Sequence, residues 1–364
     1  MDTKKIAAIV VAAFVVVAGA AAYVMLEKKS DPNTLKVAYL TKGYFPFIVG
    51  FDQGFFDDLS FNCEPLIVTG SGQTAVDAVL RGDAQMAATG EAPFVNTLGL
   101  NPGEIIGLCS YSTSEGSAGG HRWIAVPSMS GKIPAMDLDE NGDITNGQDV
   151  ADAMAQVTAS GQGRGDNGKL SIGLIYGSTT LTTFKRWCNL YDITYSERVA
   201  DDVDVQIKIF DDGAALMAAF GLNALDLMGA SEPYPTQVLD TYAGTYEISN
   251  STVVNITSSS VLCTTKAYYD KYTDQMIEFL EALAKVNKWM EENPDAAAAI
   301  CAPISGMTES AIKSSLTTAD LSVIWKDHNA GAMVETADFN GYVVTKEDFL
   351  ASCPHRNLIN GWYA

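Results

Sequence analysis

The sequence predicts an α/β fold of two similar lobes, because one helix–turn–strand unit occurs twice and strands alternate with helices throughout. The first copy spans residues 75–93 and the second spans residues 215–233. Each copy reads as an apolar helix, a tight turn, a short buried strand, and then a glutamate, Glu91 or Glu232, followed closely by proline. Ligands of open α/β sheets bind beyond the carboxyl ends of strands, so we expect each copy to deliver polar groups to a shared cleft, with the two glutamates facing each other.

The other predicted elements continue this alternation. A β-rich run over residues 35–40 is the expected first strand, and a buried run over residues 170–176 is a strand of the second lobe. The helix after that strand has four residues on one face at helical spacing: Leu181, Phe184, Cys188 and Tyr191. Further strands are expected over residues 63–69, 122–127 and 251–263, and further helices over residues 47–56, 276–290 and from Pro294 onward. Such alternation predicts largely parallel sheets.

Composition excludes several classes of protein. The formal net charge is -21 and the pI is about 4.4, whereas nucleic-acid binding demands a basic face. The six cysteines form no Cys-x-x-Cys pair and have no histidine at zinc spacing, so neither a metal centre nor another cofactor is expected. With 364 residues and 47% hydrophobic content, the chain can bury a substantial core.

The N-terminus predicts export. Lys4 and Lys5 precede an uninterrupted apolar stretch over residues 6–26, which is long enough for one membrane-spanning helix of about 20 residues. A secretory signal peptide has a shorter apolar core of roughly 7–15 residues, but the small residues 18–22 also suit cleavage. We therefore expect a soluble body outside the membrane, anchored by residues 1–30 or released when they are removed.

Two glycine–hydroxyl turns stand between a predicted strand and a predicted helix: residues 70–74 (Gly-Ser-Gly-Gln-Thr) and residues 177–180 (Gly-Ser-Thr-Thr). Free N–H groups and the positive end of the helix dipole make such a helix start an anion site. Serine and threonine are also ordinary N-caps. The occurrence of the turn in both presumed lobes favours ligand binding.

Three further patterns are weaker. Residues 163–169 nearly match a nucleotide-binding loop, but they precede a strand and Leu170 replaces the hydroxyl that would bind Mg²⁺. Residues 137–143 resemble the start of a calcium loop, but Gln148 replaces the bidentate glutamate, which favours an Asx-rich turn. His121 and Arg122 begin a predicted crossing strand and lie either at the cleft or on the surface, and the sequence has no recognisable catalytic motif.

The ordered motifs resemble a transport family: the periplasmic solute-binding proteins of ABC importers for nitrate, sulfonate, taurine, bicarbonate or thiamine-precursor pyrimidines. The resemblance covers residues 35–335 and is strongest at Gly82-Asp83 running into residues 89–93 (Thr-Gly-Glu-Ala-Pro). It implies a two-lobe type II periplasmic-binding-protein fold with a hinged cleft. Lobe 1 would comprise residues 31–119 and a return within residues 258–364, which also include a C-terminal tail without a family counterpart, and lobe 2 would comprise residues 120–257.

The resemblance also implies site residues and partners. By position, the ligand-binding residues would be Tyr44, Phe45, Ser71, Gln73, Thr89, Glu91, Ser178, Thr179 and Glu232. Lys42 or Arg122 are candidate counter-charges for an anion, whereas the two glutamates favour an amine or a ring nitrogen. The partners would be a small solute, a permease with its ATPase, and the membrane.

Two alternatives stay open at this point. A membrane-tethered sensor would use the same cleft without an importer. An enzyme of the pyrimidine-precursor type on the same fold would need a cluster of histidine and cysteine, which the sequence does not show.

Overall fold

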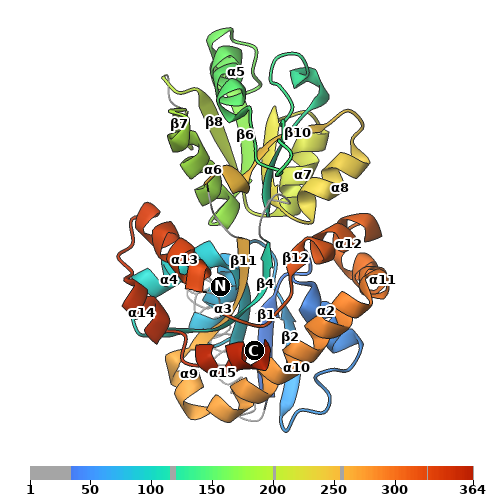
Figure 1. Cartoon of the computed structure of the whole chain (residues 1–364), viewed down its shortest axis with the longest axis vertical. Helices are drawn as coiled ribbons and strands as arrows, with labels where there is room; N and C mark the ends of the chain where they lie inside the picture. Colours follow the sequence, from blue (N-terminus) through green and yellow to red (C-terminus); the bar gives the residue numbers. More distant parts are fainter. Residues whose placement is uncertain (1–33, 115–119, 200–201, 255–257, 326, 364) are drawn as a thin grey trace, which may run out of the picture.

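The computed structural model describes residues 34–363 apart from 115–119, 200–201, 255–257 and 326, and it contains two lobes stacked along the long axis of the molecule (Figure 1). Each lobe is built on one six-stranded sheet flanked by helices. The predicted membrane segment lies outside the described residues. Within the described part of the chain, no helix combines the length and apolar character that crossing a bilayer requires.

Lobe 1 carries the sheet with the order β12-β4-β11-β3-β1-β2. Its strands are β1 (Thr34–Tyr39), β2 (Asn62–Ile67), β3 (Met86–Gly90), β4 (Ile105–Ser114), β11 (Ser258–Thr265) and β12 (Ala319–Asp320). Its helices are α2 (Phe45–Asp52), α3 (Gly72–Leu80), α4 (Glu91–Leu100), α9 (Lys266–Lys271), α10 (Thr273–Glu292), α11 (Pro294–Ser305), α12 (Glu309–Thr317), α13 (Asp327–Phe339), α14 (Lys346–Ala351) and α15 (Arg356–Asn360).

Lobe 2 carries the sheet with the order β10-β5-β9-β6-β8-β7. Its strands are β5 (His121–Ala125), β6 (Leu170–Ile175), β7 (Tyr195–Ser196), β8 (Val205–Phe210), β9 (Leu227–Ser231) and β10 (Tyr246–Asn250). Its helices are α5 (Gly147–Ala159), α6 (Thr179–Leu190), α7 (Gly213–Gly221) and α8 (Tyr234–Thr241). Short 3₁₀ turns complete the chain at η2 (Pro127–Met129), η3 (Asp166–Gly168), η4 (Ser251–Val254) and η5 (Gly361–Tyr363).

The repeated units occupy corresponding places in the two sheets. The first copy forms α3 and β3, and β3 lies between β11 and β1. The second copy forms α7 and β9, and β9 lies between β5 and β6. In each sheet the repeated strand thus separates a parallel half from the strands that connect the lobes.

The expectation of largely parallel sheets is confirmed only in part, because both sheets are mixed; in lobe 2, β6 pairs in parallel with β8 and β9, and β7 with β8. In lobe 1, β3, β1 and β2 pair in parallel, but β11 runs antiparallel to both β3 and β4. In lobe 2, β5 runs antiparallel to both β9 and β10. The reason is that β4 leads out of lobe 1, whereas β5 and β11 begin where the chain enters a lobe from its neighbour. β5 and β11 therefore oppose the direction of the strand–helix units, whereas β4 runs in the same direction as β3.

The two crossing segments pack closely between the lobes. A Cβ atom on Gly120 would lie 2.4 Å from the Cβ of Ser258 and 2.9 Å from the Cβ of Ser114. No real side chain tolerates such distances, so the first crossing needs a glycine where it passes the second. This contact places the serines that end β4 and begin β11 at the junction of the lobes.

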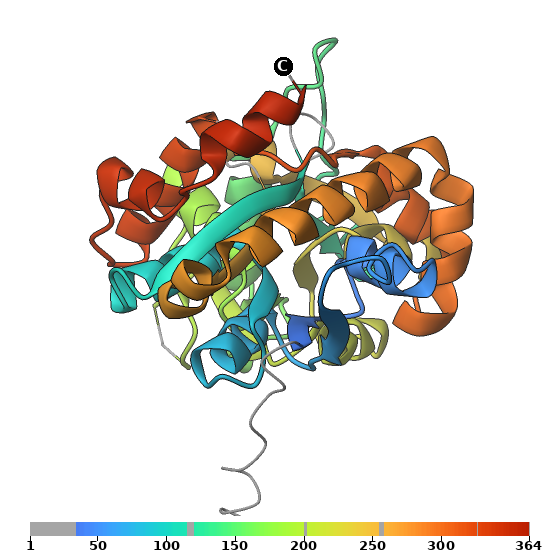
Figure 2. The same ribbon diagram turned by 90° about the horizontal axis from the view of Figure 1, so that it is seen from below.

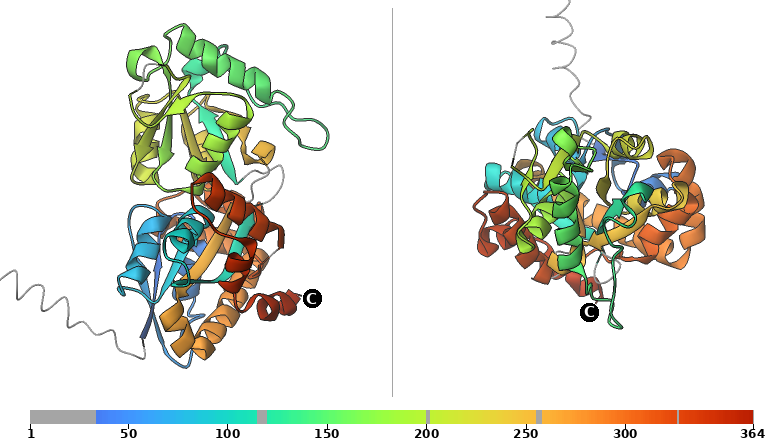
Figure 3. Two further views of the ribbon diagram at one scale, coloured as in Figure 1. Left: turned by 90° about the vertical axis from the view of Figure 1, so that its left-hand side faces the viewer. Right: turned by 90° about the horizontal axis from the view of Figure 1, so that it is seen from above.

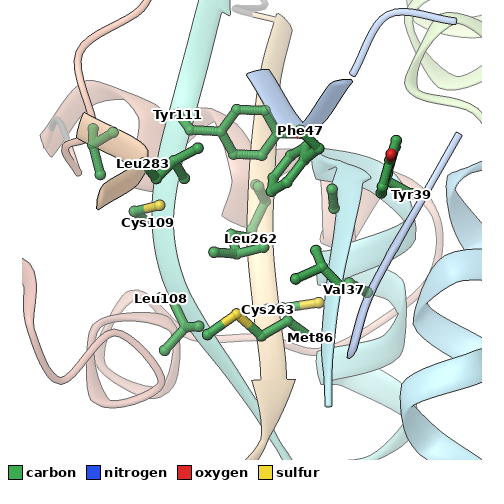
Figure 4. Packing of buried hydrophobic residues seen from close by; sticks show 14 of the residues in the cluster. Val37, Tyr39, Phe47, Met86, Leu108, Cys109, Tyr111, Leu262, Cys263 and Leu283 are labelled. Carbon is green, nitrogen blue, oxygen red and sulfur yellow. The ribbon is translucent and has the colours of Figure 1, made fainter. Parts of the chain in front are cut away.

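The core of lobe 1 forms where the crossing strands pack against the first strand and two helices (Figure 4). The Phe47 ring stacks on Tyr39 with centroids 5.5 Å apart and meets Tyr111 of β4 edge-on at 5.2 Å. The predicted long helix is confirmed as α10, whose residues Met276, Leu280, Leu283 and Met290 are all fully buried. The sequence did not predict β4, because neither its apolar half nor its serine-rich half shows a regular alternation of apolar and polar residues.

The C-terminal helices belong to lobe 1 and cover one side of it (Figure 2). Met333 and Ala337 of α13 are buried in the core of lobe 1, where α13 packs beside α4. Seen from the side, α13 lies at the top of lobe 1, against the underside of lobe 2 (Figure 3). The tail therefore forms part of the boundary between the lobes.

Candidate functional site

A cavity of about 120 Å³ lies between the lobes, lined by residues of both. Its wall is dominated by hydroxyl groups from eight serines and two threonines: Ser112, Ser114, Ser178, Ser231, Ser258, Ser259, Ser260, Ser315, Thr179 and Thr180. The glycines at positions 43, 72, 90 and 120 bring backbone close to the cavity. Among the described residues that line the cavity, Lys42 is the one lysine or arginine.

The Gly-Ser-Thr-Thr turn forms both a helix cap and a wall of the cavity. The Ser178 hydroxyl accepts a hydrogen bond from the Leu181 N–H at 3.2 Å and donates to the Ile175 carbonyl at 2.8 Å. The N–H groups of Thr179 and Thr180 belong to the first turn of α6 and have no acceptor within the helix. This turn therefore supplies donors and a positive dipole end to the cavity.

Thr179 also joins the lobes directly. Its hydroxyl oxygen accepts a 3.1 Å hydrogen bond from the N–H of Ala92, in the first turn of α4. The starts of α4 and α6 consequently meet beside the cavity, one from each lobe. This contact belongs to a closed arrangement of the lobes.

The first glycine–hydroxyl turn contributes only Gly72 to the lining. The Ser71 N–H donates to the Thr74 hydroxyl at 3.4 Å, and the Gln73 amide donates to Asp77 at 2.9 Å, both within lobe 1. Thr89 is fully buried, and a Cβ on Gly72 would lie 2.6 Å from its hydroxyl oxygen. Ser71, Gln73 and Thr89 therefore lie around the cavity rather than in its wall.

Tyr44 and Phe45 follow the first strand but face different surroundings. Tyr44 lines the cavity, and burial raises the pKa of its phenol. Phe45 is buried in the core of lobe 1 and does not reach the cavity lining. The Lys42 ammonium lies 6.0 Å from the centre of the Tyr234 ring and makes no ion pair with any described residue.

Glu232 lines the cavity and is ion-paired, although it shares the single charge of Arg122 with Glu247. The Arg122 guanidinium contacts Glu232 Oε1 at 2.7 Å through Nη1, and it contacts Glu247 Oε2 at 2.7 Å through Nε. Burial alone would lower the pKa of Arg122, but the hydrogen bonds and charges of the two glutamates raise it. Arg122 is thus a partner of carboxylates rather than a free counter-charge.

Glu91 is fully buried and is not among the residues lining the cavity. Its Oε1 accepts from the Thr336 hydroxyl at 3.5 Å, and its Oε2 has no partner among the described residues. Burial raises the pKa of Glu91 to about 8, although the Ser259 backbone, Arg186 and Thr336 oppose this shift. At neutral pH the carboxyl group is therefore mostly protonated and uncharged.

From sequence, His121 could lie either at the cleft or on the surface, and in the structure it lines the cavity at the start of β5. Its Nδ1 lies 2.7 Å from the Thr180 hydroxyl, and its Nε2 is buried without a described partner. Burial lowers the pKa of His121 to about 3, so the ring is neutral. Sequence reasoning missed the lining serines of β4 and β11, whose only signal was two serine-rich runs, residues 110–114 and 258–260.

The two weak binding motifs have local structural explanations. In the loop over residues 163–169, the Arg164 N–H donates to Asp226 and the Asp166 N–H donates to Gln206, so both donors are already used. In the loop over residues 137–143, Asp139 accepts hydrogen bonds from the backbone of Asn141 and Asp143. Among the described residues, no group of three or more histidine, cysteine or acidic side chains is arranged to hold a metal.

Two lobes with sheets of matching order, closed over a polar cavity, define the periplasmic-binding-protein fold. The periplasmic aliphatic sulphonate binding protein SsuA from Escherichia coli is similar, with a TM-score of 0.62 and 13% identity over 89% of this chain and 92% of that one. The periplasmic nitrate-binding protein NrtA from Synechocystis PCC 6803 is similar with a TM-score of 0.63 and 13% identity over 88% of both chains. The desulfurization enzyme DSZB is similar with a TM-score of 0.59 and 12% identity over 91% of this chain and 100% of that one.

At such low identity these structures show the fold alone. The sequence itself matches the model of the NMT1-like family over residues 28–305, and the chain belongs to that family. The resemblance to solute-binding proteins seen in the motifs is thereby confirmed. No curated protein matches the sequence. Residues 306–364, which include α13 to α15, lie beyond the family match.

Proposed function

We propose that the protein is the extracytoplasmic solute-binding component of an ABC importer, and that it captures a small oxyanion between its lobes for delivery to a permease. The observation that carries this proposal is the hydroxyl-lined cavity between the lobes, with the unpaired Lys42 in its wall. Neutral donors and one cation suit an anion with several acceptor oxygens.

The charges around the cavity favour an anion over an amine. From sequence, Glu91 and Glu232 argue for a positively charged group on the ligand. In the structure Glu232 is paired with Arg122, and the raised pKa of Glu91 leaves that carboxyl uncharged at neutral pH. Glu91 therefore carries little charge, and Glu232 is ion-paired with Arg122, which it shares with Glu247. Lys42 is the one unpaired cation in the described lining.

The size of the cavity restricts the ligand further. Sites for drug-sized ligands enclose roughly 300–1,000 Å³, whereas this cavity encloses about 120 Å³. A ligand of a few heavy atoms fits this space, such as nitrate, bicarbonate or a short-chain sulfonate. A pyrimidine precursor would require a more open arrangement of the lobes.

Binding would act by shifting the lobes toward the closed form. The ligand would contact lobe 1 around Lys42 and lobe 2 at the start of α6, so it interacts best when both walls are present. The Ala92–Thr179 hydrogen bond forms across the same boundary and adds to the closed state. The closed form would then dock on the permease, with residues 1–30 holding the body at the outer face of the membrane.

Because the enzyme DSZB has a similar fold, we compared a catalytic role for the cavity with a role in binding alone. The described lining contains no cysteine, and burial raises the pKa of the buried thiols Cys109, Cys188 and Cys263. His121 lines the cavity, but its lowered pKa makes it a weak base. A thiol nucleophile requires a lowered pKa, and a general base requires a pKa near the working pH. The shifts seen here therefore favour binding without chemistry.

A thermal-shift screen of the purified chain tests this function. The panel should contain nitrate, methanesulfonate, taurine, bicarbonate and a thiamine-precursor pyrimidine. A ligand at a hundred-fold excess over its Kd stabilises the folded state by about 2.7 kcal/mol, so we expect a clear rise in Tm with a small anion. If no small molecule raises Tm while a partner protein does, the importer proposal fails.

A further inference from the structure

His121 lines the cavity and has a buried ring nitrogen that no described protein group satisfies. The side chain is 2% exposed, and its Nε2 has no hydrogen-bond partner among the described residues. Buried polar atoms normally have a partner, because leaving one unpaired costs free energy. An orphaned ring nitrogen in the wall of a ligand cavity therefore indicates an atom that a ligand completes.

The other ring nitrogen is held in place by α6. Nδ1 lies 2.7 Å from the Thr180 hydroxyl, and this ring nitrogen is the only described hydrogen-bond partner of that hydroxyl. When the hydroxyl donates its proton to Nδ1, the neutral ring carries its own proton on Nε2. Nε2 is then a donor, fixed in direction by a residue of the same lobe.

The position of His121 suits a contact that depends on the ligand. It begins β5 immediately after the first crossing segment and pairs with Ser231 of β9 in the sheet of lobe 2. Lys42 lines the same cavity from lobe 1. A ligand between them would meet a cation from one lobe and a directed neutral donor from the other.

We propose that His121 is a ligand-contact residue whose Nε2–H donates a hydrogen bond to an oxygen of the bound anion. This inference rests on the proposed function and deepens it, because it makes the ligand group at this wall of the cavity a hydrogen-bond acceptor. A ligand that presents an ammonium group or another donor here would leave two donors opposed.

The protonation of the ring can be measured without any ligand. Long-range ¹H–¹⁵N NMR of the intact protein distinguishes a proton on Nε2 from a proton on Nδ1. We expect the Nε2–H form in the free protein, and a shift of that Nε2 resonance when methanesulfonate or nitrate is added. A proton on Nδ1 would overturn the proposal, because Nε2 would then be an acceptor.

Two substitutions separate the ligand contact from the contact with Thr180. In His121→Gln the amide nitrogen reaches the region of Nε2, whereas in His121→Asn it stays near the position of Nδ1. Loss of a hydrogen bond to a charged group predicts that His121→Asn weakens methanesulfonate binding by roughly ten- to hundred-fold. His121→Gln should retain affinity within about three-fold, because it keeps the donor.

The outcomes distinguish this inference from the proposed function. If His121→Asn binds methanesulfonate as well as the wild type, or if both variants lose affinity equally, His121 has a structural role and the inference fails alone. If the wild type binds neither methanesulfonate nor nitrate, the proposed function fails and the inference falls with it. The NMR result on the wild type stands even if a variant does not fold.

Discussion

The Thr182 hydroxyl of α6 donates a 3.1 Å hydrogen bond to Oδ1 of Asn340 and thereby joins lobe 2 to the C-terminal tail of lobe 1. The Asn340 amide donates in turn to Asn96 of α4 at 3.0 Å. Arg186 and Glu335 add an ion pair of 3.2 Å across the same boundary. The tail, which lies beyond the family match, therefore stabilises the closed arrangement from outside the cavity.

Replacing Asn340 with alanine should speed release of the ligand. The variant loses the hydrogen bond between the lobes, and a net contribution of about 0.5–1.5 kcal/mol per hydrogen bond predicts a roughly two- to ten-fold weaker Kd, mainly through the off-rate. Surface plasmon resonance or stopped-flow fluorescence measures that rate. Asn357→Ala, on the exposed face of α15, is the matched control. An off-rate equal to that of the control would show that the tail does not support closure.

Replacing Thr179 with valine should weaken ligand binding by roughly ten-fold, because one cavity donor and the acceptor of the Ala92 N–H are both lost. Titration calorimetry with the best-binding anion measures the effect. Thr183→Val is the control, since this buried hydroxyl donates to the Thr179 carbonyl but does not line the cavity. We expect the control to lose some stability but to keep its affinity. Equal affinities in the two variants would reduce the turn to a helix cap.

Replacing Arg122 with leucine should destabilise lobe 2. Glu232 and Glu247 have side chains only 7% and 13% exposed, and both would lose their charged partner. Removing one member of a buried ion pair costs about 3–5 kcal/mol, which urea unfolding would reveal as a lower midpoint. Lys313→Ala breaks an exposed pair with Asp295 and should cost less than about 1 kcal/mol. Similar midpoints for both variants would contradict this account of Arg122.

Glu91 should make stability depend on pH. Its pKa is raised from 4.5 to about 8, so the folded state holds a proton that the unfolded state releases between these values. The free energy of unfolding should therefore fall as pH rises from about 4.5 to about 8, by up to about 5 kcal/mol. Glu91→Gln should remove this dependence and exceed the wild type in stability at pH 8, whereas exposed Glu140→Gln should not. Parallel pH profiles for wild type and Glu91→Gln would refute the assignment.

Elements with a strong local signal could be predicted from the sequence. The repeated helix–turn–strand unit and the amphipathic pattern of α10 rest on local spacing, and Ser178 caps α6 as its residue type suggests. β4 was missed because it combines a fully buried half with a serine-rich half, and neither half alternates. The tail helices were missed because they are short and depend on packing against lobe 1.

The site was less predictable because its properties arise from contacts between distant segments. Ser112 and Ser260 come together only through the pairing of β4 with β11, and serine gives no periodic signal. The pairing of Glu232 with Arg122 depends on the register of β5 and β9, so from sequence both charges appeared available to a ligand. The burial of Glu91 under α13 could not be anticipated without the tail.

The most direct measurement is a calorimetric titration of the purified chain with three ligands of similar size and different charge: methanesulfonate, dimethyl sulfone and tetramethylammonium. Our account predicts that the anion binds with one site per chain, while the neutral and cationic analogues bind at least ten-fold more weakly, because Lys42 and the hydroxyl lining favour negative charge. Binding of the neutral or cationic analogue as tightly as the anion would contradict the proposal that the cavity selects a small oxyanion.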